Sequence, residues 1–181
     1  MQDQKKILLQ TPSQTVGPFF AYGLTPEQYG YDFDSWVDHQ MVNPLDHPDA
    51  ITVTGKVFDG VGESIPDAML EIWQNDGHNR LFGRFGTGTE PGNRFVFHTI
   101  KPKPFDGNAP FLSVILFMRG QLLHSYTRIY FSDEAAQNEK DTVLLAVPAE
   151  RRQTLVAQKR KDLYEFDIYM QGPKETVFFE V

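Results

Sequence analysis

The sequence predicts an all-β protein: an antiparallel β-sandwich with an irregular N-terminal arm and one or two short helices. Three observations support this class. Apolar and polar residues alternate with period two in several short segments, stretches of good helix formers are few and short, and proline and glycine crowd the first fifty residues. Many short strands with few short helices are typical of an antiparallel sandwich or barrel.

The first core strand is expected at 51–57, where the alternation is regular and an Asp59-Gly60 turn follows. Further strands are expected at 69–74, 94–100, 111–118, 126–131, 164–170 and 176–181. The segment 111–118 is continuously apolar, which is typical of a strand buried on both faces. No internal repeat, low-complexity tract or second-domain boundary interrupts these segments.

Two segments favour helix. Ser132 can cap a short helix, with Asp133 and Glu134 favourably placed in its first turn. The segment 149–160 is rich in good helix formers. Both helices are short, so the class remains all-β.

The N-terminal arm, 1–50, contains repeated prolines that exclude a long helix or a central strand. It is nevertheless rich in Phe, Tyr and Trp, which a disordered arm would lack. We therefore expect an ordered arm that packs on its own domain or on a partner chain. The arm and the sandwich core, 51–181, form a single domain, since 181 residues fit one domain of ordinary size.

The composition excludes several function classes. A net charge of −7 disfavours nucleic acid and an anionic membrane surface, both of which need clustered cations. The absence of cysteine excludes disulfides and thiolate chemistry, and it suits the cytoplasm. Residues 1–14 contain no apolar signal segment, and the longest apolar run is too short to cross a bilayer.

Common catalytic motifs are absent: the sequence has no GxSxG, no GxxxxGK[ST] and no HExxH. The five histidines are scattered, and no two are spaced two to four residues apart. One residue is notable. Arg119 directly follows the apolar strand and precedes Gly120, so it is either an ordinary turn arginine or a cation that binds a carboxylate at a pocket mouth.

Several segments together resemble those of intradiol ring-cleaving dioxygenases. They are TPSQTVGPF at 11–19, VTGKVFDG at 53–60, LEIWQ at 70–74, HTIKP at 98–102, TRIYF at 127–131, and QG with ETVFF at 171–179. The order and the spacing agree from about residue 11 to the end of the chain. This resemblance implies a β-sandwich and a role in catechol ring cleavage.

Catalytic members of that family hold Fe(III) with two tyrosines and two histidines, a donor set that suits a hard Lewis acid. At the corresponding positions this sequence has Leu81, Phe105, Phe111 and Ser113. Leucine and phenylalanine have no lone pair to offer a metal, and a lone serine hydroxyl is a poor ligand. We therefore predict no catalytic residue and no metal ligand in this chain.

Loss of the ligands with retention of the fold resembles the non-catalytic alpha subunit of two-subunit family members. The resemblance implies a beta subunit that carries Fe(III), assembled with this chain as multiple alpha–beta pairs. It also implies a small carboxylated catechol and O2 as substrates. The substrate-binding residues it implies here are Thr15, Gly17, Pro18 and Arg119. The arm would close the pocket, and Arg119 would face the substrate carboxylate or the charge developing on the ring.

Two alternatives compete with the subunit hypothesis. The chain could be a stand-alone β-sandwich that binds small aromatic ligands without catalysis. It could also be an enzyme whose site gathers the scattered histidines from distant strands.

Overall fold

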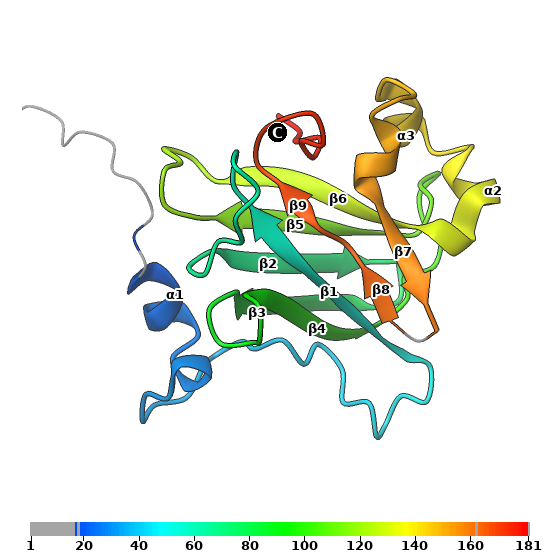
Figure 1. Ribbon diagram of the computed structural model, residues 1–181. Helices are drawn as coiled ribbons and strands as arrows, with labels where there is room; N and C mark the ends of the chain where they lie inside the picture. Colours follow the sequence, from blue (N-terminus) through cyan, green and yellow to red (C-terminus); the bar gives the residue numbers. More distant parts are fainter. Residues whose placement is uncertain (1–16, 18, 162, 181) are drawn as a thin grey trace, which may run out of the picture.

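The computed structural model describes residues 17, 19–161 and 163–180. Nine strands form the body of this part of the chain, and the helices are short (Figure 1). They are β1 (Ala50–Phe58), β2 (Met69–Asn75), β3 (Arg80–Gly86), β4 (Arg94–Ile100), β5 (Phe111–Phe117), β6 (Ser125–Phe131), β7 (Val156–Arg160), β8 (Leu163–Glu165) and β9 (Ile168–Tyr169). The short helices are α1 (Phe19–Leu24), η1 (Glu27–Tyr29), η2 (Ser132–Glu134), α2 (Ala135–Asn138), α3 (Thr142–Ala146) and η3 (Arg152–Leu155).

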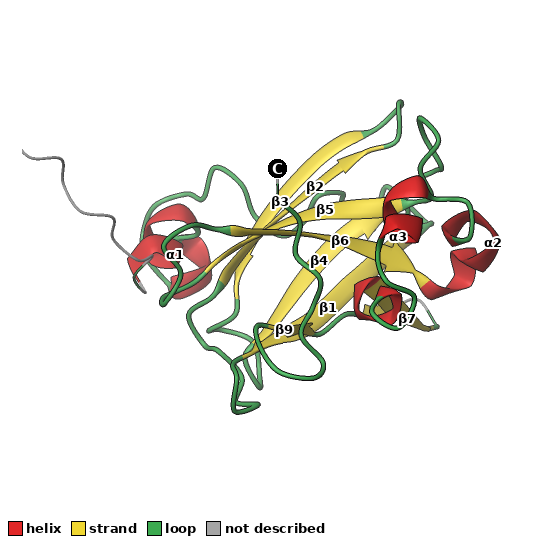
Figure 2. Ribbon diagram, turned by 90° about the horizontal axis from the view of Figure 1, so that it is seen from above, coloured by secondary structure: helices red, strands yellow, loops and turns green. Residues whose placement is uncertain are grey.

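The strands form two layers that enclose the core (Figure 2). Hydrogen bonding runs in the order β3-β2-β5-β6-β7-β8-β1-β4, with β9 paired to β1. Strand β7 pairs with β6 on one side and with β8 on the other, so it joins the layers. Helix α1 lies at one end of the layers, and α2 and α3 lie at the other (Figures 1 and 2).

The predicted all-β class is confirmed, but the antiparallel detail is wrong. Strand β1 runs parallel to β8 and to β9, and β6 runs parallel to β7. Parallel pairs need long connections, and here the segment with α2, α3 and η3 carries the chain from β6 to β7. The sheet is therefore mixed and nearly closed.

Four secondary-structure assignments made from the sequence differ from the structure. Strand β3 was not predicted. The expected strand at 164–170 is divided into β8 and β9. The segment 149–160 is not a helix: η3 is followed at once by β7, whose pairing with β6 and β8 overrides helix propensity. Of the expected strand at 176–181, the described part makes only an isolated bridge, between Phe179 and Tyr126.

The core lies between the layers and holds large apolar side chains from both. Phe95 and Phe97 of β4 are fully buried, as are Leu112 of β5 and Ile129 of β6. A glycine is required at position 55 in β1, because a Cβ atom there would overlap the backbone carbonyl group of residue 166. This close approach lets the chain pass over β1 between β8 and β9.

Strand β5 is buried on one face only, so the prediction of two buried faces is wrong. Burial alternates along it, and Phe111, Ser113, Ile115 and Phe117 are half-buried on the outer face. Three of these four outer residues are apolar, and the last of them meets another element: the Phe117 ring centroid lies 5.3 Å from that of Phe20 in α1. The outer face of β5 is thus the surface on which the functional candidates lie.

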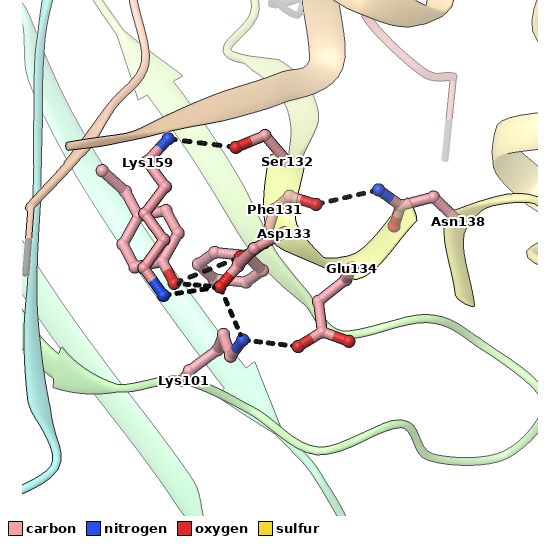
Figure 3. A network of polar contacts seen from close by, with 8 residues as sticks. Lys101, Phe131, Ser132, Asp133, Glu134, Asn138 and Lys159 are labelled. Atoms are coloured by element: carbon pink, nitrogen blue, oxygen red, sulfur yellow. Dashed lines mark hydrogen bonds and ion pairs between the residues drawn. The ribbon is translucent and has the colours of Figure 1, made fainter. Parts of the chain in front are cut away.

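A polar network ties the end of β6 to β4, β7 and β8 (Figure 3). Asp133 accepts hydrogen bonds from Lys159 Nζ at 2.8 Å, from Tyr164 Oη at 3.0 Å and from Lys101 Nζ at 3.2 Å. Ser132 does not cap the helix as expected; its Oγ instead accepts the Lys159 backbone N–H. The network therefore holds the two layers together where β7 crosses between them.

Candidate functional site

The four positions at which the resemblance implies iron ligands in catalytic relatives converge on adjoining cavities at one end of the outer face. Leu81, Phe111 and Ser113 line a cavity of about 360 Å³. Phe105 lines a second cavity, of about 140 Å³, that shares Phe111 and Asn75 with the first. Three features position these residues: the β2–β3 hairpin, the start of β5, and the loop after β4.

This cavity pair does not fit a ferric ion. The Leu81, Phe105 and Phe111 side chains contain no donor atom, and Ser113 supplies one neutral hydroxyl. The Arg128 guanidinium carbon lies 4.0 Å from the centre of the Phe111 ring, and that fixed positive charge opposes a second cation. In the described residues no group of three or more His, Asp or Glu could hold a metal ion.

Arg119 lies in the turn after β5, where Gly120 takes the left-handed conformation with φ of 87°. Its Nε is 3.2 Å from Oδ2 of Asp67, and its side chain remains 61% exposed. Asp67 is buried, and its other oxygen, Oδ1, has no hydrogen-bond partner within the described part of the chain. Asp67 therefore holds the Arg119 guanidinium at Nε, and the exposed side chain leaves the two Nη groups facing outward.

Of the three arm positions implied by the resemblance, only Gly17 lies within the described residues; Thr15 and Pro18 do not. Gly17 is exposed, and its carbonyl accepts the N–H of Phe20 at 3.0 Å. Phe20 in turn packs on Phe117, two residues before Arg119. The structure thus brings the start of α1 and the Arg119 turn to the same end of the molecule (Figure 1).

That end is opposite to the cavities at the iron-equivalent positions. Phe111 and Phe117 are the first and last residues of β5. Six residue steps along a strand correspond to about 20 Å. Arg119 and Gly17 therefore cannot act on a molecule bound in this chain's own cavities.

The histidines do not assemble into a catalytic cluster. The rings of His39 and His98 are 5.5 Å apart, centroid to centroid, and burial together with the charge of His39 lowers the pKa of His98. His124 contacts Tyr126 at the far end of the sheet. In the described residues, no third His, Asp or Glu lies beside either contact to complete a metal site. The structure therefore gives no support to the alternative of an enzyme whose site gathers the scattered histidines.

Two residues of interest escaped the sequence analysis. Asp67 carries no local signal, because its partner Arg119 is distant in sequence and meets it only through the pairing of β2 with β5. Arg128 was predicted only as part of a strand; its register opposite Ser113 places it against Phe111, a residue of the cavity wall. No helix in the described part of the chain is long and apolar enough to span a membrane.

Solved structures share the fold. A dioxygenase domain from Streptomyces sp. SirexAA-E superposes with a TM-score of 0.60 at 19% identity, covering 82% of this chain and 95% of that one. An intradiol ring-cleavage dioxygenase from Tetranychus urticae gives 0.58 at 14% identity, covering 77% and 89%. The fold of this chain is therefore one that intradiol ring-cleavage dioxygenases also have.

Comparison with the sequences of known proteins identifies the family to which the chain belongs. No family model matches the chain. A protocatechuate 3,4-dioxygenase alpha chain from Burkholderia cepacia is 48% identical over 194 residues, covering 96% of this chain and 98% of that protein. Another, from Pseudomonas putida, is 37% identical over 201 residues, covering 97% and 98%. The chain belongs to the family of protocatechuate 3,4-dioxygenase alpha chains.

Proposed function

We propose that this chain is the iron-free alpha subunit of a dioxygenase that cleaves 3,4-dihydroxybenzoate between its two hydroxyls. The reaction consumes O2 and yields 3-carboxy-cis,cis-muconate. A beta subunit of the same fold carries Fe(III), and this chain completes the wall of the substrate pocket. The names of both relatives support this role over that of a stand-alone aromatic binder, since both are chains of an enzyme.

One observation carries the proposal: the iron-equivalent positions are close together in space but hold Leu81, Phe105, Phe111 and Ser113. The fold is retained while the donors are lost. Iron chemistry at this place in the fold therefore needs another chain that supplies phenolate and imidazole donors.

The position of Arg119 supports a role in the partner's pocket. It lies about 20 Å along β5 from this chain's own cavities. Burial of Asp67 fixes the guanidinium at Nε, so its two Nη groups remain available to a carboxylate from outside. Thr15, Gly17 and Pro18 belong to the same proposed wall. A methyl group added at Gly17 would meet no described atom within 4 Å, which leaves room there for a partner.

The arm provides surface for the partner. Trp36 is 98% exposed, and Phe33 and Tyr31 are about half-exposed on the same arm. Aromatic residues of this kind are enriched in the cores of protein interfaces. In the proposed assembly, arm 1–50 and core 51–181 form one domain, and multiple alpha–beta pairs associate in the cytoplasm.

The test is to purify the chain alone and together with its partner, and to measure iron, the visible tyrosinate-to-iron band and turnover of 3,4-dihydroxybenzoate. We expect none of the three for the chain alone and all three for the complex. Stoichiometric iron and turnover in the isolated chain would overturn the proposal.

A further inference from the structure

The cavities at the iron-equivalent positions have the size and walls of a small-molecule site. Together they reach the lower end of the volumes found for ligand pockets, which suits a ligand with a single ring. Trp73 and Phe82 form one wall, with ring centroids 4.2 Å apart, and Phe111 belongs to both cavities. Trp73 is 48% exposed, which is unusual for so large an apolar side chain on a sheet.

Unpaired cations surround these aromatic walls. Arg80 lines the larger cavity, Lys103 lines the smaller one, and Arg128 stacks on Phe111. Within the described residues, none of the three forms a salt bridge. Among the same residues, Asp106 is the one acidic group that lines either cavity, and the larger cavity has Arg80 and no acidic group in its wall.

Arg128 is held in place by neutral groups. Its Nη1 donates to Oδ1 of Asn108 at 3.3 Å and to the hydroxyl of Tyr130 at 3.2 Å. The guanidinium also stacks on the ring of Phe111 and so supports this wall of the cavities from behind, without lining either cavity.

A polar side chain in the cavity wall also lacks a partner. Gln74 is 3% exposed; its Oε1 accepts the hydroxyl of Thr99 at 2.8 Å. Its Nε2 is buried and finds no acceptor in the part of the chain that the structure describes. An unsatisfied buried donor is costly, and this one lies behind the cavity wall, out of contact with the cavity itself.

We infer that this pocket, lined by Trp73, Leu81, Phe82, Phe111 and Ser113, binds a single-ring aromatic carboxylate. The ring packs between the aromatic walls, and the carboxylate faces the guanidinium group of Arg80. The site is separate from the proposed partner pocket at the Arg119 end of β5, and it needs no metal.

The test counts ligands in the assembled, iron-loaded complex, with 4-hydroxybenzoate as the probe, because a single hydroxyl prevents ring cleavage. Equilibrium dialysis measures all bound probe, while the visible iron band reports only the probe at the partner's iron. We expect dialysis to give two molecules per alpha–beta pair and the band to saturate with one. One molecule per pair by dialysis would overturn the inference.

Two variants locate the second molecule. Ser113→Leu fills the cavity, and Arg80→Gln removes an exposed cation without disturbing the core; Arg80→Lys keeps the charge as the matched control. We expect Ser113→Leu to reduce the count from two to one. Arg80→Gln should weaken the second molecule at least tenfold, and Arg80→Lys should restore most of that loss. A second molecule insensitive to both changes would place it elsewhere and refute the assignment.

The outcome is independent of the proposed function. If the chain has no iron-bearing partner, dialysis of the full chain alone still predicts one molecule of probe per chain. Absence of the iron band with one bound probe would contradict the subunit role and support the pocket. An iron band that saturates with one probe, with no further probe found by dialysis, would contradict the pocket and leave the subunit role standing.

Discussion

Replacing Asp133 by Asn tests the network that joins the two layers. Burial by itself raises the pKa of Asp133, but hydrogen bonds from Lys159, Tyr164 and Lys101 outweigh it and lower the pKa from 3.8 to about 2. A shift of that size corresponds to about 2 kcal/mol of folding free energy before solvent screening. The Asp133 side chain is 25% exposed, and screening by solvent reduces this contribution to about 1 to 2 kcal/mol.

The sign of the pH dependence follows from the direction of the shift. Because the folded pKa lies below the unfolded value, the stabilisation is fully present well above pH 3.8 and is lost as the pH falls toward 2. Asp133→Asn should therefore lower the free energy of unfolding by about 1 to 2 kcal/mol at pH 7. The difference from the parent protein should shrink to near zero at about pH 2.

Urea unfolding between pH 2 and 7, followed by circular dichroism, measures this difference. Asp76, whose pKa is also lowered to about 2, is present in both proteins, so the difference between the curves isolates Asp133. Glu150→Gln, at an exposed position, is the control and should change stability by less than about 0.5 kcal/mol. An Asp133→Asn protein as stable as the parent at pH 7, or a difference that does not depend on pH, would refute the reasoning.

Three further predictions concern the pocket wall and the fold. In the assembled enzyme, Arg119→Gln should raise KM for 3,4-dihydroxybenzoate by about 10- to 100-fold, the loss of one charged hydrogen bond, with iron content as in the parent; equal kinetics would remove Arg119 from the pocket. Asp67→Asn should also raise KM, by a smaller factor, because the Arg119 guanidinium that Asp67 holds becomes free to move. If KM and its dependence on pH both stay as in the parent enzyme, Asp67 does not position Arg119. Gly55→Ala should cost about 3 kcal/mol, because its Cβ would overlap the Phe166 carbonyl oxygen, whereas Gly23→Ala, in open space, should cost much less; similar melting temperatures for the two would contradict the packing.

The sequence predicted the strands whose pattern is local. Strand β1 alternates in sequence, so its period alone revealed it, although Val53, Thr54 and Gly55 are all buried in the fold. Strand β7 could not be predicted in this way, because lysine, arginine and glutamine favour a helix in isolation. Pairing with β6 and β8 decides its conformation, and those strands are distant or follow later in the chain.

The same distinction between local pattern and strand pairing applies to the candidate site. The lost ligand positions could be identified in the sequence, because each lies at a fixed place within a recognisable segment. The cavity they form could not, since it depends on the β2–β3 hairpin meeting the start of β5. The salt bridge from Arg119 to Asp67 could not be predicted for the same reason: its two ends approach only when β2 and β5 pair.

The central claim is that this chain completes an iron site held by its partner and holds no iron itself. Anomalous diffraction at the iron edge from crystals of the assembled enzyme tests it most directly. We predict one iron peak per alpha–beta pair, bonded only to the partner, with the Arg119 end of this chain closest to it. A peak within bonding distance of Leu81, Phe105, Phe111 or Ser113 would contradict the account.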